Sequence, residues 1–399
     1  MCKIAILEPI GAHGGNDIYD YNLVNSLCIQ DATEATLYTC DITKPKKGYN
    51  VKLLYKSIYG NDNKFFRAIR YFKGTFISLL DAKKNKANII HLHFFGFNSL
   101  EYTNLYMAKK IFGFTVIGTI HDVESFEKYA KNDTTKHDYR KFISLLSGIV
   151  VHTDYAKKEL INNIGTKLIS PKKIKTIYAC DLDYTTLNNN QIEMSKAREK
   201  LNLPLDREIL LFFGQIKKVK GLNILLEALA EVCIEAPEIL LVIAGKVWKD
   251  DFSEYEKLIQ KHSLQNNIDL RISFVANDDV PYYFNAVNAI VLPYQKIYNS
   301  GVLIRAMSFA TPIIASDFGP FKEFIDNNEN GFLFKTGNKK DLAVTILNAL
   351  QNKDKLLHIG KKGKTTIEQK FSLIEIGQQY CEFYNEVLGE EKMLNDNKK

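Results

Sequence analysis

The sequence predicts an α/β protein made of two Rossmann-like, doubly wound domains that face each other across a cleft. Short apolar runs recur along the chain and leave room for a helix between them. These runs are rich in Ile, Val and Leu and do not alternate with polar residues, as expected of strands buried on both faces of a parallel sheet. The pattern begins afresh near residue 205, after a polar stretch at 185–200, which indicates a second domain and a ligand cleft between the two.

In the first half we expect strands at 3–7, 89–93, 115–120 and 148–151, within an N-terminal domain at 1–184. In the second half we expect strands at 209–213, 239–243, 272–275, 289–292 and 312–315, within a second domain at 205–370. Residues 185–204 are predicted to be the linker. The stretch at 371–399 is predicted to be a C-terminal helix that crosses back to the N-terminal domain, ended by Gly389 and followed by a charged tail.

Composition excludes several classes of protein. The 399 residues include 53 Lys and Arg against 46 Asp and Glu, a net charge of +7, with 25% charged and 46% hydrophobic residues. This is a globular composition, and the basic bias is too weak to predict a nucleic-acid partner. Six scattered cysteines without a C-x-x-C pair indicate free thiols. The strand-like start MCKIAILEPIG and the absence of a long apolar run predict a cytoplasmic protein without a signal peptide.

Two stretches have the character of anion sites. The strand at 209–213 runs into Gly214, three lysines follow at 217, 218 and 220, and Gly221 opens an apolar-striped helix. The alternative is a solvated lysine loop. In the second stretch Ser300 is a good N-cap, followed by Gly301 and Val302, whose free N–H groups suit a phosphate. Here the alternative is simply a capped helix.

Together these stretches resemble glycosyltransferase family 4, retaining enzymes of GT-B fold that use nucleotide sugars. The resemblance rests on Gly-x-Ile-x-x-x-Lys-Gly at 214–221, Leu-Pro-Tyr at 292–294, Ser-Gly-Val at 300–302, Pro-Ile-Ile-Ala-Ser at 312–316, Glu323 and Asn-Gly-Phe-Leu-Phe at 330–334. Weaker likenesses in the N-terminal half are Gly14-Gly15, His91-Leu92-His93 and Thr119-Ile120-His121-Asp122.

The resemblance implies that the domain at 1–184 binds the acceptor and that the domain at 205–370 binds the nucleotide sugar. It also implies roles for individual residues. Lys220, Lys217 and His121 are the implied catalytic residues: Lys220 contacts the leaving phosphate, and His121 lies near the donor sugar. Gly14 and Gly15 form the implied loop at the donor phosphate and acceptor. The implied nucleotide-sugar-binding residues are Gly214, Gln215, Val275, Tyr294, Ser300, Gly301, Val302 and Arg305.

The sequence departs from the family pattern at three main positions, and Ala310, where glycine is usual, is a minor change. Gln215 replaces the usual arginine, for which Lys217 could substitute, and the two glutamates expected eight residues apart are Ile297 and Arg305. A subgroup with Ser-Gly-Val lacks both glutamates as well. The departures leave open a non-catalytic GT-B subunit that binds a glycan or a partner transferase.

We expect no metal and no cofactor. Asp181-Leu182-Asp183 spells a metal-binding pattern, but carboxylates near the linker are more often solvated turn residues. His91 and His93 share one face of a strand without a third ligand in view. For His121 we expect a hydrogen bond to a sugar hydroxyl.

A basic amphipathic helix is predicted over 64–80. Phe65, Ile69, Phe72, Phe76, Leu79 and Leu80 form one apolar stripe, and Lys64, Arg67, Arg70 and Lys73 lie on its flanks and opposite side. These four cations are candidate contacts to an anionic membrane surface. The alternative is that the stripe packs on the domain's own sheet, and we expect the Phe65-Phe66 pair in the core.

The sequence thus predicts a metal-independent transferase that moves a hexosyl unit from a UDP- or GDP-linked sugar, with retention, to a glycan. By resemblance, the acceptor is a lipid-linked oligosaccharide for surface polysaccharide, met at the cytoplasmic membrane face. A soluble sugar phosphate is the alternative acceptor.

Overall fold

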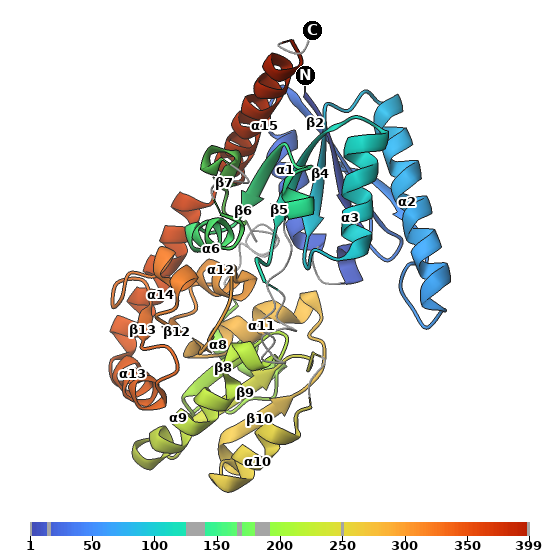
Figure 1. Ribbon diagram of the computed structural model, residues 1–399. Helices are drawn as coiled ribbons and strands as arrows, with labels where there is room; N and C mark the ends of the chain where they lie inside the picture. The colour runs from blue at the N-terminus through green and yellow to red at the C-terminus, as the bar shows by residue number, and fades with distance from the viewer. Residues whose placement is uncertain are drawn as a thin grey trace. The chain divides into compact units, whose positions relative to one another are not determined.

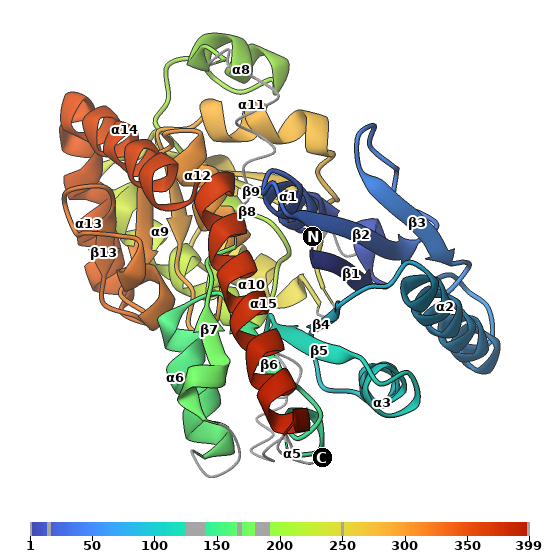
Figure 2. The ribbon, with the colours of Figure 1, turned by 90° about the horizontal axis from the view of Figure 1, so that it is seen from above.

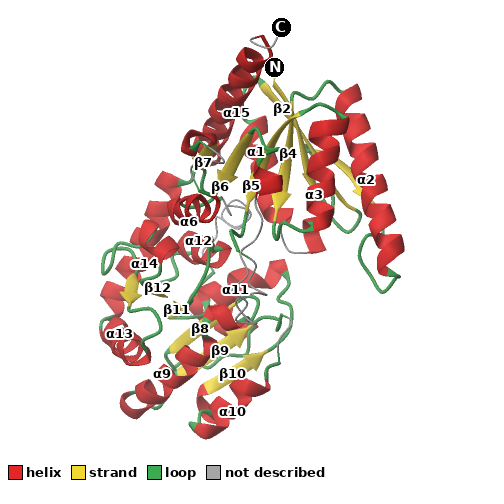
Figure 3. Ribbon diagram, viewed as in Figure 1, coloured by secondary structure: helices red, strands yellow, loops and turns green. Residues whose placement is uncertain are grey.

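The chain folds into two compact α/β units. The computed structural model describes residues 2–13, 17–124, 140–165, 170–179, 192–248 and 251–396. Unit 1 spans 1–181 and 371–399, and unit 2 spans 182–370 (Figure 1). Each unit contains a parallel sheet with helices on its faces (Figure 3), so the predicted fold class of two Rossmann-like units is confirmed.

Unit 1 has a seven-stranded sheet in the order β3-β2-β1-β4-β5-β6-β7. The strands are β1 Cys2–Glu8, β2 Thr33–Cys40, β3 Asn50–Tyr55, β4 Ile89–Phe94, β5 Thr115–Ile120, β6 Gly148–Val151 and β7 Ile174–Thr176. The helices are α1 Asp17–Cys28, α2 Lys64–Lys84, α3 Ser99–Tyr106, α5 Arg140–Ile143, α6 Asp154–Ile164 and α15 Leu373–Asp396, with a π-helical turn at Met107–Ile111. The four predicted strands are present, and β2, β3 and β7 are additional.

The C-terminal helix belongs to unit 1. Figure 2 shows α2 and α3 side by side, while α15 packs along α1. The helix does not end at Gly389 as expected but continues to Asp396. The extra turns are held by Glu391, whose carboxylate pairs with Lys109 at 2.5 Å and accepts hydrogen bonds from Ser147 and Thr115.

Unit 2 has a six-stranded parallel sheet in the order β10-β9-β8-β11-β12-β13. The strands are β8 Ile209–Phe213, β9 Leu240–Ala244, β10 Ile268–Arg271, β11 Ala289–Leu292, β12 Ile313–Ser316 and β13 Phe332–Phe334. The helices are α8 Met194–Lys200, α9 Leu222–Glu235, α10 Ser253–Lys261, α11 Val280–Asn285, α12 Gly301–Ser308, α13 Lys339–Gln351 and α14 Lys353–Lys370. Short 3₁₀ turns lie at Lys218–Lys220 and Gly319–Glu323, among others.

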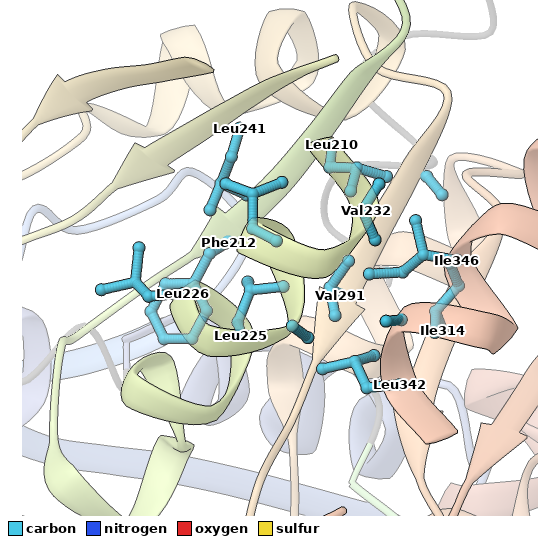
Figure 4. Close-up of a cluster of buried hydrophobic side chains, with 14 of the residues drawn as sticks. Leu210, Phe212, Leu225, Leu226, Val232, Leu241, Val291, Ile314, Leu342 and Ile346 are labelled. Atoms are coloured by element: carbon cyan, nitrogen blue, oxygen red, sulfur yellow. The ribbon is translucent and has the colours of Figure 1, made fainter. Parts of the chain in front are cut away.

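The core of unit 2 lies between the sheet and two of its helices. Leu210, Phe212, Leu241, Val291 and Ile314 from the strands meet Leu225, Leu226 and Val232 of α9 and Leu342 and Ile346 of α13 (Figure 4). All ten are fully buried. Burying apolar surface stabilises a fold by about 25 cal/mol per Å² removed from water. This layer therefore stabilises β8 and β11, which position the loops at their ends.

Two expectations about unit 2 differ from the structure. The apolar run at 272–275 is not a strand: the edge strand β10 ends at Arg271, and Phe274 beyond it is 73% exposed. Within the expected linker at 185–204, residues 194–200 form α8, and Arg198 on this helix is buried. Its guanidinium donates to the carbonyls of Ala286 and Leu205, so this segment is anchored to unit 2.

Candidate functional site

The loop after β8 turns sharply at Gly214. The φ angle of Gly214 is +97°, a conformation that L side chains rarely adopt. A Cβ placed on it would lie 3.2 Å from Lys220 Nζ and 3.3 Å from Val302 Cγ2. The end of β8, the lysine loop and the start of α12 therefore meet at one place, as expected for neighbouring parallel strands with a shared carboxyl edge.

Gly221 lets the lysine loop approach the sheet. Its φ is +66°, and a Cβ there would lie 2.0 Å from the carbonyl oxygen of Pro293. The backbone N–H of Gln295 also donates to the carbonyl of Val219 at 2.7 Å. This close approach fixes Lys220 beside the segment that follows β11.

Lys220 is surrounded by an aromatic ring and other cations. Its Nζ lies 5.1 Å from the centroid of the Tyr294 ring, which is 1% exposed. Burial, together with the positive charges of Lys217 and Arg305, lowers the pKa of Lys220 to about 7. An anion bound here would favour the charged form of Lys220 over the neutral amine. The site therefore suits a negatively charged ligand.

Lys217 faces the only tryptophan of the chain. Its Nζ lies 4.3 Å from the centroid of the Trp248 ring, in the loop after β9. Lys218, by contrast, is exposed and pairs with Glu254 at 3.5 Å. The sequence did not indicate Trp248, because a single tryptophan in a loop carries no spacing signal.

Ser300 begins α12. Its Oγ accepts a hydrogen bond from the backbone N–H of Leu303 at 3.2 Å, as predicted for an N-cap. The first N–H groups of a helix, here those of Gly301 and Val302, have no acceptor within the helix. Because Val302 lies beside Gly214 and Lys220, these donors and the ammonium can act on one ligand.

The geometry can hold a diphosphate. It combines an ammonium, a second cation and a helix N-terminus at the carboxyl edge of one sheet, the usual location of ligands in doubly wound folds. Gln215, which follows β8, is exposed, and Val275, which follows β10, is half-buried. Both lie beyond the carboxyl ends of their strands, on the same edge of the sheet.

Comparison with known proteins agrees with this geometry. Residues 193–366 match the family "Glycosyl transferases group 1". This part of the chain is therefore similar to a glycosyltransferase group 1 domain. The match covers nearly all of unit 2, and therefore includes Gly214, Lys220 and Ser300.

Two relatives each share 26% identity with part of this chain. Spore coat protein SA of Bacillus subtilis is 26% identical over 65% of this chain and 70% of its own length. The capsular polysaccharide biosynthesis glycosyltransferase CapM of Staphylococcus aureus is 26% identical over 51% of this chain and 52% of its own. Among solved structures, Anabaena Alr3699/HepE with UDP-glucose superposes with a TM-score of 0.74 at 18% identity, over 97% of this chain and all of that one. This likeness shows that the fold is that of GT-B glycosyltransferases.

Unit 2 carries a cation where the resemblance implies a carboxylate. Arg305 is half-buried on α12 and close enough for its charge to lower the pKa of Lys220. Ile297, in place of the other glutamate, is 8% exposed and packs in the core. The site is therefore more positive than the family pattern implies.

Unit 1 gathers three histidines around Tyr19, and a fourth, His91, lies next to His93. The ring centroids of His93, His121 and His152 lie 5.4, 5.1 and 5.1 Å from that of Tyr19. His91 contacts the Tyr384 hydroxyl at 2.5 Å and Thr119 Oγ1 at 2.7 Å. Burial lowers the pKa of His91 to about 3 and that of His152 to about 4, so these rings are neutral near pH 7.

His121 follows β5, and its ring stacks on Phe95 with centroids 4.4 Å apart. Burial and the neighbouring histidines lower its pKa well below the usual value. A neutral, half-buried imidazole can exchange hydrogen bonds with a hydroxyl group but does not supply a positive charge.

A pair of buried acids in unit 1 was not indicated by the sequence. Glu8 at the end of β1 and Asp20 on α1 are both fully buried, and the charge of Glu8 contributes to raising the pKa of Asp20. Burial raises the pKa of Glu8 to about 7 and that of Asp20 well above its usual value. Glu8 also accepts from the N–H groups of Ile10 and Gly11.

The remaining predicted residues are in different situations. Gly14, Gly15 and Asp181-Leu182-Asp183 lie outside the described residues. In α2, Arg67 donates to the carbonyl of Gly60 and Arg70 pairs with Asp62 at 2.6 Å, while Lys64 and Lys73 are exposed. Within the described ranges, no group of three His, Cys, Asp or Glu side chains is placed to hold a metal, and no helix is long and apolar enough to span a bilayer.

Proposed function

We propose that the protein is a retaining glycosyltransferase that moves a hexosyl unit from a UDP- or GDP-linked sugar to a glycan acceptor. The observation that carries the proposal is the meeting of Lys220, Gly214 and the start of α12 within the region similar to a group 1 domain. The acceptor we propose is a lipid-linked oligosaccharide for surface polysaccharide, met at the cytoplasmic membrane face. CapM, named for capsular polysaccharide biosynthesis, supports this choice.

The proposed chemistry uses fixed charges instead of a protein nucleophile. As the bond between the anomeric carbon and the diphosphate breaks, negative charge grows on the leaving oxygens. Lys220, Lys217 and the N–H groups of Gly301 and Val302 stabilise that charge more than the charge of the bound donor, which is the condition for catalysis. The acceptor oxygen bonds to the anomeric carbon on the face the diphosphate leaves, and its proton passes to a leaving phosphate oxygen.

Other residues have positioning roles in the proposal. His121, being neutral, donates a hydrogen bond to a sugar hydroxyl. Gly14 and Gly15 contact the donor phosphate and acceptor, and Gln215, Val275 and Tyr294 line the nucleotide. We propose that Arg305 binds a phosphate oxygen, since its charge suits the diphosphate and not the ribose. The reaction needs no metal in this scheme, and chelation with EDTA should leave the rate unchanged.

The test is transfer from defined donors. Purified protein is incubated with UDP- and GDP-linked hexoses and with three acceptors: a lipid-linked oligosaccharide, a soluble oligosaccharide and a sugar phosphate. We expect product with an α-linkage from an α-linked donor, only with a glycan acceptor. Transfer to the sugar phosphate alone would replace the proposed acceptor.

A second candidate function is a non-catalytic subunit, favoured by the replacement of both glutamates by Ile297 and Arg305. It predicts glycan binding without release of free sugar from any nucleotide sugar. Slow hydrolysis of the matching donor in the absence of acceptor excludes it.

A further inference from the structure

The helix α2 packs on unit 1 mainly with small residues, and most of its large apolar residues are exposed. Thr75, Ser78, Leu79 and Ala82 are buried, while Phe65, Phe66, Ile69, Phe76, Ile77 and Leu80 are 37–67% exposed. At 100° per residue, the two sets lie on opposite sides of the helix. The expectation that Phe65 and Phe66 belong to the core is therefore wrong.

The reason is the close approach of α2 to the sheet. A Cβ on Gly74 would lie 2.8 Å from Tyr55 Cδ1 and 3.0 Å from the carbonyl oxygen of Leu54, so only glycine fits there. Thr75 Oγ1 donates to Asn104 Oδ1 at 2.7 Å and contacts the Tyr55 hydroxyl at 3.3 Å. These contacts fix the rotation of the helix and leave no room for Phe or Ile on its inner side.

The exposed apolar face extends beyond α2. The Phe76 ring lies edge-on to Phe112, with centroids 5.6 Å apart, and Ile111 next to it is 60% exposed. We call Phe65, Phe66, Ile69, Phe76, Ile77, Leu80 and Ile111 the α2 apolar face. Large contiguous apolar surfaces of this kind mark interaction sites in soluble domains.

The charges around the α2 apolar face are almost all positive. The 21 residues of α2 include six cations, Lys64, Arg67, Arg70, Lys73, Lys83 and Lys84, against one carboxylate, Asp81. Asp81 is paired with Lys52 at 2.5 Å. Four of the cations, Lys64, Lys73, Lys83 and Lys84, are exposed, so α2 offers both exposed apolar side chains and exposed ammonium groups.

We propose that the α2 apolar face docks on the surface of an anionic lipid bilayer, with Phe65, Phe66 and Ile69 inserted at the level of the headgroups. An amphipathic helix lying in the interface gains both from burying its apolar side and from attraction to anionic lipid. Charge complementarity selects this occupant over a second copy of the chain, because two copies would bring the same cations together. The inference extends the proposed function, since a lipid-linked acceptor is itself held in a bilayer.

The test is flotation of the full chain with vesicles of phosphatidylcholine alone or with phosphatidylglycerol at an equal share. We expect binding to the anionic vesicles only, weakened by 1 M salt. Phe65→Ser, Phe66→Ser and Ile69→Ser combined should lower partition at least roughly 100-fold, because three large apolar side chains are lost. Lys73→Ala with Lys84→Ala should lower it roughly fivefold per lysine.

The matched control is Ile234→Ser in α9 of unit 2, an 81% exposed apolar residue outside the α2 apolar face, which should not change partition. UDP and GDP titrations on every variant show that unit 2 is folded and keep this test separate from the proposed function. Equal partition of the triple variant and the native protein overturns the proposal. The proposal is also overturned if the native protein does not bind anionic vesicles. It is overturned as well if the native protein is a dimer that the triple substitution dissociates.

Discussion

The ammonium group of Lys220 lies 5.1 Å from the centre of the Tyr294 ring, at the point where β8 and α12 converge. Removal of this ammonium should reduce transfer while the fold is retained. For Lys220→Ala we expect kcat/KM to fall at least roughly 10²-fold, since one donor to a developing anion is commonly worth about 10²–10³. Lys218→Ala is the control, because Lys218 is exposed and paired with Glu254. Equal losses in the two variants would show that loop charge, and not Lys220 itself, matters.

Nucleotide affinity should depend on pH through Lys220. The pKa of Lys220 in the free protein is about 7, so its amine loses the positive charge as pH rises above 7. To bind a diphosphate at higher pH, Lys220 must first take up a proton. We expect UDP or GDP affinity to fall between pH 6.5 and 8.5, measured by titration calorimetry. Lys220→Arg keeps its charge over this range and should flatten the profile. The same slope in both proteins would contradict the assignment.

Gly221→Ala should weaken nucleotide binding and stability together. Its φ is +66°, and the added Cβ would meet the Pro293 carbonyl oxygen at 2.0 Å. Gly337→Ala is a matched control with φ +78° and nothing within 4 Å of the added Cβ. We expect left-handed backbone strain to lower the free energy of unfolding of both variants by about 1 kcal/mol in urea unfolding. Gly221→Ala alone should lose more stability than this and should also bind the nucleotide more weakly. Identical behaviour would mean that the approach to Pro293 relaxes freely.

The stability of unit 1 should fall as pH rises through neutrality, because of Glu8. Burial raises the folded-state pKa of Glu8 from 4.5 to about 7. The unfolded chain therefore releases this proton above about pH 4.5 while the folded chain retains it, so stability is lost as pH rises toward and through 7. Glu8→Gln removes this titration and should make the slope of unfolding free energy between pH 5.5 and 8.5 less steep. The exposed Glu34→Gln should leave the slope unchanged.

The C-terminal helix should be loosened by Tyr384→Phe. The Tyr384 hydroxyl contacts His91 Nδ1 at 2.5 Å, and both side chains are buried. Loss of the hydroxyl leaves a buried ring nitrogen without that partner, at a cost of about 1–3 kcal/mol. Hydrogen exchange along α15 should increase. The exposed Tyr106→Phe serves as the control, and an unchanged unfolding midpoint for Tyr384→Phe would contradict the role of this contact.

Much of the sheet architecture could be predicted because strands buried on both faces have continuous apolar runs. The strand β2 was missed because TEATLYTC mixes threonine and glutamate with apolar residues, and 272–275 was misassigned because apolar residues also occur in exposed loops. The meeting of Gly214, Lys220 and Val302 follows from β8 and β11 being neighbours in the sheet. Sequence spacing alone cannot supply the distances.

Other features depend on tertiary contacts that no local pattern contains. Periodicity identified an apolar stripe in α2, but Gly74 against Tyr55 decides which side of the helix packs. Glu8 and Asp20 are single acids in the sequence, and their pairing becomes visible only when β1 and α1 come together. The helix continues through Gly389 because Glu391 beyond it pairs with Lys109 and accepts hydrogen bonds from Ser147 and Thr115.

The most direct test of the central claim is calorimetric titration of the native protein and of Lys220→Ala with UDP and with GDP. We expect one nucleotide to bind the native protein with a dissociation constant below about 1 mM, and the substitution to weaken that binding at least roughly tenfold. If neither nucleotide binds, or if both proteins bind equally, the assignment of the Lys220 and Ser300 region as a nucleotide-sugar site is wrong.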